Sequence, residues 1–82
     1  MSQFEKLLLT VLRGASDANI EFDDLYRLLT QLGFEVRIKG SHHVFSKEDV
    51  SELVNLQRDG AKAKPYQVTQ VRQVIVKYKL GV

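Results

Sequence analysis

The spacing of apolar residues changes at Gly33, from the period of a helix to the period of a strand. In residues 22 to 32 the apolar side chains recur every three or four positions, which predicts an amphipathic helix. In residues 34 to 39 they alternate strictly with charged side chains, which predicts a half-buried strand. Gly40 and Ser41 then favour a sharp reversal, and residues 42 to 45 return as an antiparallel strand. A helix followed at once by a hairpin indicates an α+β fold.

The segments on either side extend this order. Ser2-x-x-Glu5 has the spacing of a capping box, so a first helix is expected over residues 2 to 14. A third, weaker strand is expected over residues 52 to 57, followed by a loop over residues 58 to 64. The last segment fits both periods, but its length and Pro65 at its start favour a helix. The predicted order is helix, helix, three antiparallel strands, helix.

Size and composition narrow the class of protein. With 82 residues the chain has room for one domain with a modest core, spanning residues 1 to 82. It has no cysteine, which excludes disulfides and zinc–thiolate sites. No apolar run approaches the roughly 20 residues that span a bilayer, and the first residues lack the features of a signal peptide. A cytoplasmic protein without a membrane segment is therefore expected.

Charge is distributed unevenly along the chain. Residues 1 to 57 carry six Lys/Arg and nine Asp/Glu, a balance of −3, whereas residues 58 to 82 carry six Lys/Arg and one Asp, a balance of +5. A basic segment on a near-neutral domain suggests contact with a polyanion, usually nucleic acid. A solvated helix face would explain the same charges equally well.

Both histidines, His42 and His43, begin the returning strand of the hairpin. Because neighbouring residues on a strand point to opposite faces, the two imidazoles cannot easily bind one metal together, and no cysteine or further histidine could complete a transition-metal site. His43 shares a face with Phe45, the best core candidate in this strand. His42 should therefore face solvent, beside the outward row of Arg37 and Lys39.

This arrangement suggests a metal-independent reaction on a phosphodiester. Histidine is suited to proton transfer near neutral pH, so His42 could act as general acid or base toward an RNA 2′-hydroxyl or leaving oxygen. Arg37 and Lys39 could stabilise the charge that develops on the phosphate, and Gly40 would allow close approach of the backbone. From the residues alone, a polar hairpin that carries two surface histidines is the simpler interpretation.

The motif Gly-Ser-His-His-x-Phe, placed after a helix, Gly33-Phe34 and an alternating strand, resembles the HicA-type toxins of bacterial toxin–antitoxin systems. The segment from Asn55 to Val68 continues the resemblance, which covers about residues 20 to 80; the helix over residues 2 to 14 is additional. The resemblance implies a fold like the double-stranded RNA-binding domain and an mRNA endonuclease (mRNA interferase) that needs no metal or cofactor. It also implies a HicB-type antitoxin as partner.

The resemblance assigns the catalytic role to His42, in the motif Gly40-Ser41-His42, with His43 as second choice. Candidate contacts to flanking RNA are the exposed cations and one aromatic residue: Arg37, Lys39, Lys62, Lys64, Tyr66, Arg72 and Lys77. For Tyr66, a structural role at the start of the last helix is the alternative to stacking on a base.

Two other functions fit the same residues. The first is a non-catalytic RNA-binding module, since the implied fold binds duplex RNA in other proteins. The second is a degenerate toxin that only binds its antitoxin. Oligomeric state and cleavage preference do not follow from the sequence.

Overall fold

The computed structural model describes residues 2 to 81 and begins with two helices that the sequence predicts. Helix α1 (Gln3–Arg13) starts where the Ser2 hydroxyl accepts a hydrogen bond from the Glu5 amide, and it ends at Gly14 in the left-handed conformation. The link that follows contains a short 3₁₀ helix, η1 (Asp17–Asn19). Helix α2 (Phe22–Gln31) ends two residues before Gly33.

Three antiparallel strands form the sheet in the order β1-β2-β3. Their bounds are β1 (Glu35–Lys39), β2 (His42–Lys47) and β3 (Val50–Leu56). The second and third strands are longer than the sequence predicted. Ser46 and Lys47 extend β2, Val50 and Ser51 extend β3, and residues 48 and 49 form the turn between the two strands. The order of helices and strands, and hence the α+β class, is confirmed.

The loop expected over residues 58 to 64 is a small second hairpin, formed by β4 (Arg58–Asp59) and β5 (Lys62–Ala63). It is tied to the start of α2, where the Phe22 amide donates to the Ala61 carbonyl. This hairpin carries the chain from the end of β3 to the start of the last helix, so it fixes how these two elements approach each other.

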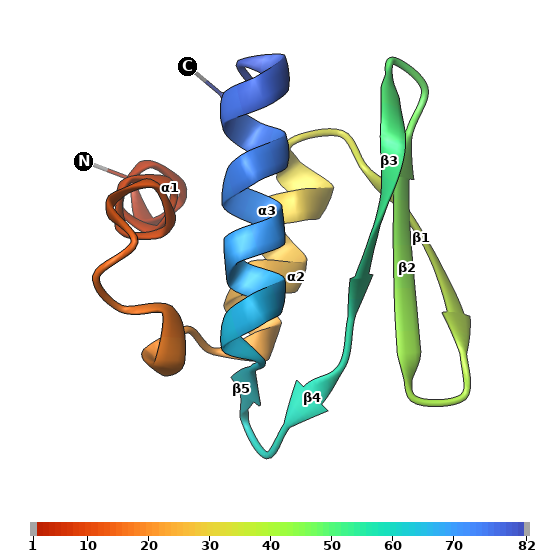
Figure 1. Ribbon diagram of the computed structural model, residues 1–82, viewed down its shortest axis with the longest axis horizontal. Helices are drawn as coiled ribbons and strands as arrows, with labels where there is room; N and C mark the ends of the chain where they lie inside the picture. The colour runs from red at the N-terminus through yellow and green to blue at the C-terminus, as the bar shows by residue number, and fades with distance from the viewer. Residues whose placement is uncertain (1, 82) are drawn as a thin grey trace.

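The final segment is the helix α3 (Pro65–Tyr78), as predicted. Figure 1 shows α2 and α3 on one face of the sheet, with α1 packed outside them and viewed nearly end-on. The core between helices and sheet is apolar and fully buried at its centre; its largest members include Phe22, Leu25, Leu29, Phe45, Val54, Leu56, Val68 and Ile75. None of the described helices is both long enough and apolar enough to cross a bilayer.

The other face of the sheet is not covered by any helix of the described chain (Figure 1). We call it the open face. By strand alternation it presents Arg37, Lys39, His42, Val44, Leu53 and Asn55, since the intervening residues Phe45 and Val54 are buried beneath the helices. Side chains on this face are therefore available to a partner.

Candidate functional site

His42 lies on the open face at the hairpin end of β2, exposed to solvent. Its Nδ1 lies 3.4 Å from Oδ1 of Asn55, and its Nε2 lies 3.3 Å from Nε2 of Gln57. The side-chain oxygen of Gln57, Oε1, in turn accepts a hydrogen bond from Nζ of Lys64 at 3.3 Å. The imidazole is thus connected through one amide to a lysine that precedes α3.

The chemistry of these partners fixes the direction of each bond. The Asn55 carbonyl oxygen can only accept, so Nδ1 of His42 is the protonated nitrogen. The Gln57 amide nitrogen can only donate, so Nε2 of His42 is the unprotonated one. This assignment leaves Nε2 with an unprotonated electron pair, as a general base requires, and that pair accepts only the contact from Gln57. Because the contact to Gln57 is long, a substrate hydroxyl could replace it at little cost.

Two further cations share the open face with His42. Lys39 lies directly opposite His42 across the β1–β2 ladder, where paired Cβ atoms are about 5 Å apart. Arg37 lies opposite Val44, two residues along β1 from Lys39 on the same face. Arg37 and Lys39 thus lie on the β1 side of His42, and Lys64 is joined to it through Gln57 from the β3 side. A phosphate beside His42 would therefore meet Lys39 on one side and Lys64 on the other.

The turn between β1 and β2 consists of Gly40 and Ser41. Gly40 has a φ of 59°, in the left-handed region that glycine adopts without strain. The space around Gly40 is open, because a Cβ built there meets no atom within 4 Å. The turn therefore leaves the approach to His42 clear, and Gly40 serves the reversal itself.

His43 points to the opposite side of the sheet, toward α2. Its ring packs edge-on against Phe22, with centroids 4.9 Å apart, and against Tyr26, with centroids 5.8 Å apart. Its Nδ1 is buried and has no hydrogen-bond partner among the residues that the structure describes. The two histidines are therefore separated by the sheet, and they cannot act together on one proton.

Three of the cations singled out in the sequence are engaged in ion pairs elsewhere. Lys62 pairs with Glu21 at 3.0 Å, and Lys77 pairs with Glu52 at 2.9 Å. Lys77 lies near the end of α3 that is far from Lys64, about 18 Å along the helix axis from its start. It is therefore remote from His42.

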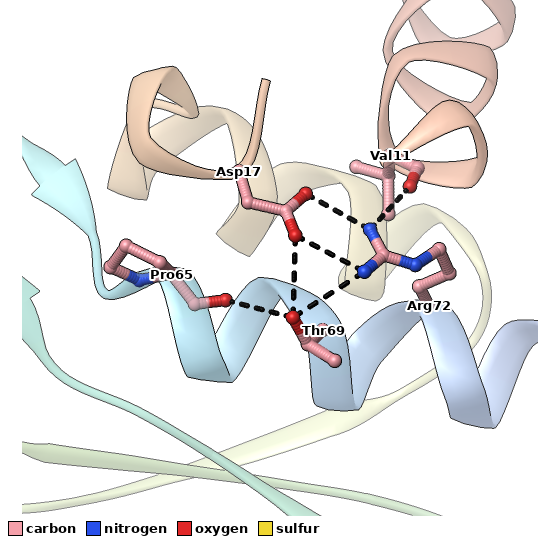
Figure 2. A network of polar contacts seen from close by, with 5 residues as sticks. All are labelled: Val11, Asp17, Pro65, Thr69 and Arg72. Carbon is pink, nitrogen blue, oxygen red and sulfur yellow. Dashed lines mark hydrogen bonds and ion pairs between the residues drawn. The ribbon is translucent and has the colours of Figure 1, made fainter. Parts of the chain in front are cut away.

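Arg72 is the third of these cations, and it faces α1 and η1 rather than the sheet (Figure 2). Its guanidinium donates to both carboxylate oxygens of Asp17, at 2.9 and 3.1 Å, and to the Val11 carbonyl at 3.1 Å. Hydrogen bonds from Arg72 lower the pKa of Asp17. The contact ties the additional helix α1 to α3, which leaves Arg72 poorly placed for RNA.

Comparison with protein-family models gave one informative match. The model described as the HicA toxin of bacterial toxin–antitoxin systems matches residues 22 to 76, from the start of α2 almost to the end of α3. The chain belongs to the HicA family. Searches among curated proteins and among solved structures found no match.

Membership of the HicA family places the chain in a general class, that of toxins which act as mRNA interferases and are paired with an antitoxin. The matched region includes both hairpins and both histidines. Helix α1 lies outside it, so α1 is an addition to the part of the chain that defines the family.

Tyr66 lies in the first turn of α3 and is 64% exposed. The amide nitrogen of the buried Gln67 side chain lies 3.5 Å from its hydroxyl, and the Gln67 carbonyl oxygen accepts from the Gln57 backbone amide at 2.9 Å. Tyr66 is thus anchored near the residues around His42, while most of its ring surface is free.

Sequence reasoning missed the polar partners of His42, namely Asn55 and Gln57. Asn55 lies near the end of β3 and Gln57 directly follows the strand, and the intervening residues Val54 and Leu56 are fully buried. This alternation was visible in the sequence and could have placed both amides on the open face. Their contact with the imidazole depends on the pairing of β2 with β3, which the sequence does not specify.

Proposed function

We propose that the chain is an endoribonuclease in which His42 acts as general base, and that a HicB-type antitoxin neutralises it. The observation that carries the proposal is the position of His42: exposed, with an unprotonated Nε2 that has only a long contact to Gln57, and between Lys39 and Lys64. RNA supplies its own nucleophile, so no bound cofactor or metal is needed for the first step.

The reaction follows from this geometry. Nε2 of His42 takes the proton of the ribose 2′-hydroxyl, and the oxygen attacks the adjacent phosphorus. Lys39 and Lys64 stabilise the negative charge that builds on the phosphate oxygens. The bond to the 5′-oxygen breaks, and that oxygen takes a proton from water, which gives a 2′,3′-cyclic phosphate on one fragment and a 5′-hydroxyl on the other; His42 returns its proton to solvent.

The test compares the unchanged chain with His42→Gln on an mRNA substrate in EDTA. Glutamine keeps some hydrogen bonding but cannot transfer a proton, so we expect cleavage to slow by roughly 10²- to 10⁴-fold. Ser46→Ala is the matched control, because it lies on the same strand and face at the other end of β2. Equal cleavage by His42→Gln would remove His42 from the mechanism, and RNA that is bound but uncut would favour the RNA-binding module.

The open face also suits the antitoxin. Leu53 is 60% exposed there, on β3, and a partner seated over it would also cover His42. We expect Leu53→Asp to weaken binding of a HicB-type antitoxin, while RNA cleavage persists. Val76→Asp, on α3 and 61% exposed, is the matched control. If both variants lose antitoxin binding equally, or if neither loses it, the antitoxin binds elsewhere.

A further inference from the structure

A second site lies on the helix side of the hairpin, where the imidazole of His43 borders a hollow of ≈ 370 Å³. Phe22, Tyr26 and His43 form its aromatic wall. A cavity of this size is within the range of small-ligand sites, which is about 300–1,000 Å³. The catalytic proposal makes no use of this hollow.

The charges at its rim argue against a free phosphate as the occupant. Arg58 pairs with Asp23 at 2.7 Å, and Arg27 lies 3.7 Å from Asp24. Each cation is thus balanced by a carboxylate, so the rim has little net charge to attract an anion. A neutral, planar group fits these surroundings better.

Arg58 offers such a group a stacking surface. Its guanidinium lies over the Phe22 ring, 4.3 Å from the centroid, and its side chain remains half exposed. Guanidinium planes and aromatic rings are the surfaces on which single-stranded RNA bases stack. The Thr30 hydroxyl, also in the lining, donates to the Arg27 carbonyl and retains acceptor capacity.

The hollow is linked to His42 through two pairs of consecutive residues. His42 and His43 are neighbours on β2, and Gln57 and Arg58 are neighbours after β3. The first member of each pair belongs to the catalytic group, and the second lines the hollow. Figure 1 shows the β1–β2 turn and the β4–β5 hairpin at the same end of the molecule. An RNA strand that crosses this end would pass from one site to the other.

We propose that this hollow receives the base of a nucleotide flanking the cleaved bond, and that His43 and Thr30 make cleavage depend on the identity of that base. The proposal rests on the endoribonuclease function, and it assigns to His43 a role in specificity rather than in proton transfer. The base would stack beside Tyr26 and Arg58, with its polar edge toward Thr30 and His43.

The test measures binding and cleavage separately. Short RNAs that differ in one base, with a 2′-O-methyl group at the cleavage site, report binding preference without cleavage; unmodified RNAs of the same sequences report cut positions. We expect the unchanged chain to prefer one base in both assays. His43→Phe, which keeps the aromatic packing, should reduce that preference about tenfold, and Thr30→Val should reduce it in the same direction.

Thr10→Val is the matched control, because Thr10 also donates from a helix to a backbone carbonyl but lies on α1. Cleavage without any base preference, or a preference unchanged in both His43→Phe and Thr30→Val, would overturn the inference and leave the endoribonuclease intact. Base-selective binding without cleavage would instead support the hollow as the base-binding site and overturn the catalytic proposal.

Discussion

At the scale of single residues, strand alternation separates groups that are neighbours in the chain. His42 and Val44 lie on the open face, whereas His43 and Phe45 lie beneath the helices. Phe45 is fully buried, and its ring packs edge-on against Tyr26 with centroids 5.3 Å apart. The same residue that completes the core thus fixes which histidine is exposed.

The stability of this arrangement is tested by Phe45→Ala. Removing a fully buried ring leaves a cavity, so we expect a loss of about 3–5 kcal/mol in the free energy of unfolding. Val44→Ala, on the open face of the same strand, should cost under about 1.5 kcal/mol, since that side chain is only partly buried. Urea unfolding of both variants measures the difference. Similar losses of unfolding free energy would contradict the assignment of Phe45 to the buried face and Val44 to the open face.

At the scale of elements, two polar contacts hold helices in place from outside the apolar core. Asp17 and Arg72 join η1 to α3 on the side of α1 (Figure 2). Glu52 on β3 accepts hydrogen bonds from Lys77 and Tyr78 at the far end of α3. These contacts fix the middle of α3 relative to the added helix and its last turn relative to the sheet.

The first contact predicts a specific loss. Asp17→Asn removes the charge that receives two hydrogen bonds from a half-buried guanidinium, so we expect a loss of about 1.5–3 kcal/mol in stability. Asp24→Asn is the control, because its pair with Arg27 is exposed and long, and such pairs contribute under about 1 kcal/mol. Thermal unfolding of both variants provides the measurement; equal shifts would mean that Arg72 does not secure α1.

The second contact predicts a dependence on pH. The hydrogen bond from Tyr78, with those from Lys77 and Ser51, lowers the pKa of Glu52 to about 2. A carboxylate with a lowered pKa stabilises the fold above its ordinary pKa of 4.5, and this stabilisation is lost as the pH falls toward 2. We therefore expect the Tm of the unchanged chain to fall more steeply between pH 4.5 and 2 than that of Glu52→Gln. If Tm falls equally with pH in both proteins, Glu52 does not contribute this pH-dependent stability.

At the scale of the whole molecule, the uneven charge of the sequence is largely balanced in space. Arg58, Lys62, Arg72 and Lys77 each pair with an acidic residue from the first 57 positions. The basic final segment is therefore not an extended basic surface. The candidate phosphate contacts gather instead around the open face near His42.

This distribution predicts which lysines bind RNA. Lys39→Ala should reduce the salt dependence of RNA affinity, by about 0.7 in the slope of log K against log salt, because one phosphate contact is lost. Lys77→Ala should leave that slope unchanged, since Lys77 pairs with Glu52 far from His42. Titrations at several salt concentrations measure both, and a larger effect for Lys77 would mean that RNA follows α3 instead.

The sequence predicted the elements well where local chemistry decides them. Period-2 alternation at Val36 and Ile38 and the Gly40-Ser41 reversal were enough to place the hairpin, although Ile38 is 60% exposed at the sheet edge. The second hairpin, Arg58 to Ala63, was missed. Its strands are two residues long and depend on contacts with the start of α2, so no local sequence pattern predicts them.

By itself, the sequence determined the α+β class, the order of the elements and the face on which each histidine lies, because periodicity and alternation are local properties of the backbone. Only the tertiary structure decided which residues surround those histidines. The Gln57 contact to His42 and the aromatic wall around His43 join segments 15 to 21 positions apart in the chain. Such contacts arise from strand pairing and helix packing, whose geometry is set by the whole core.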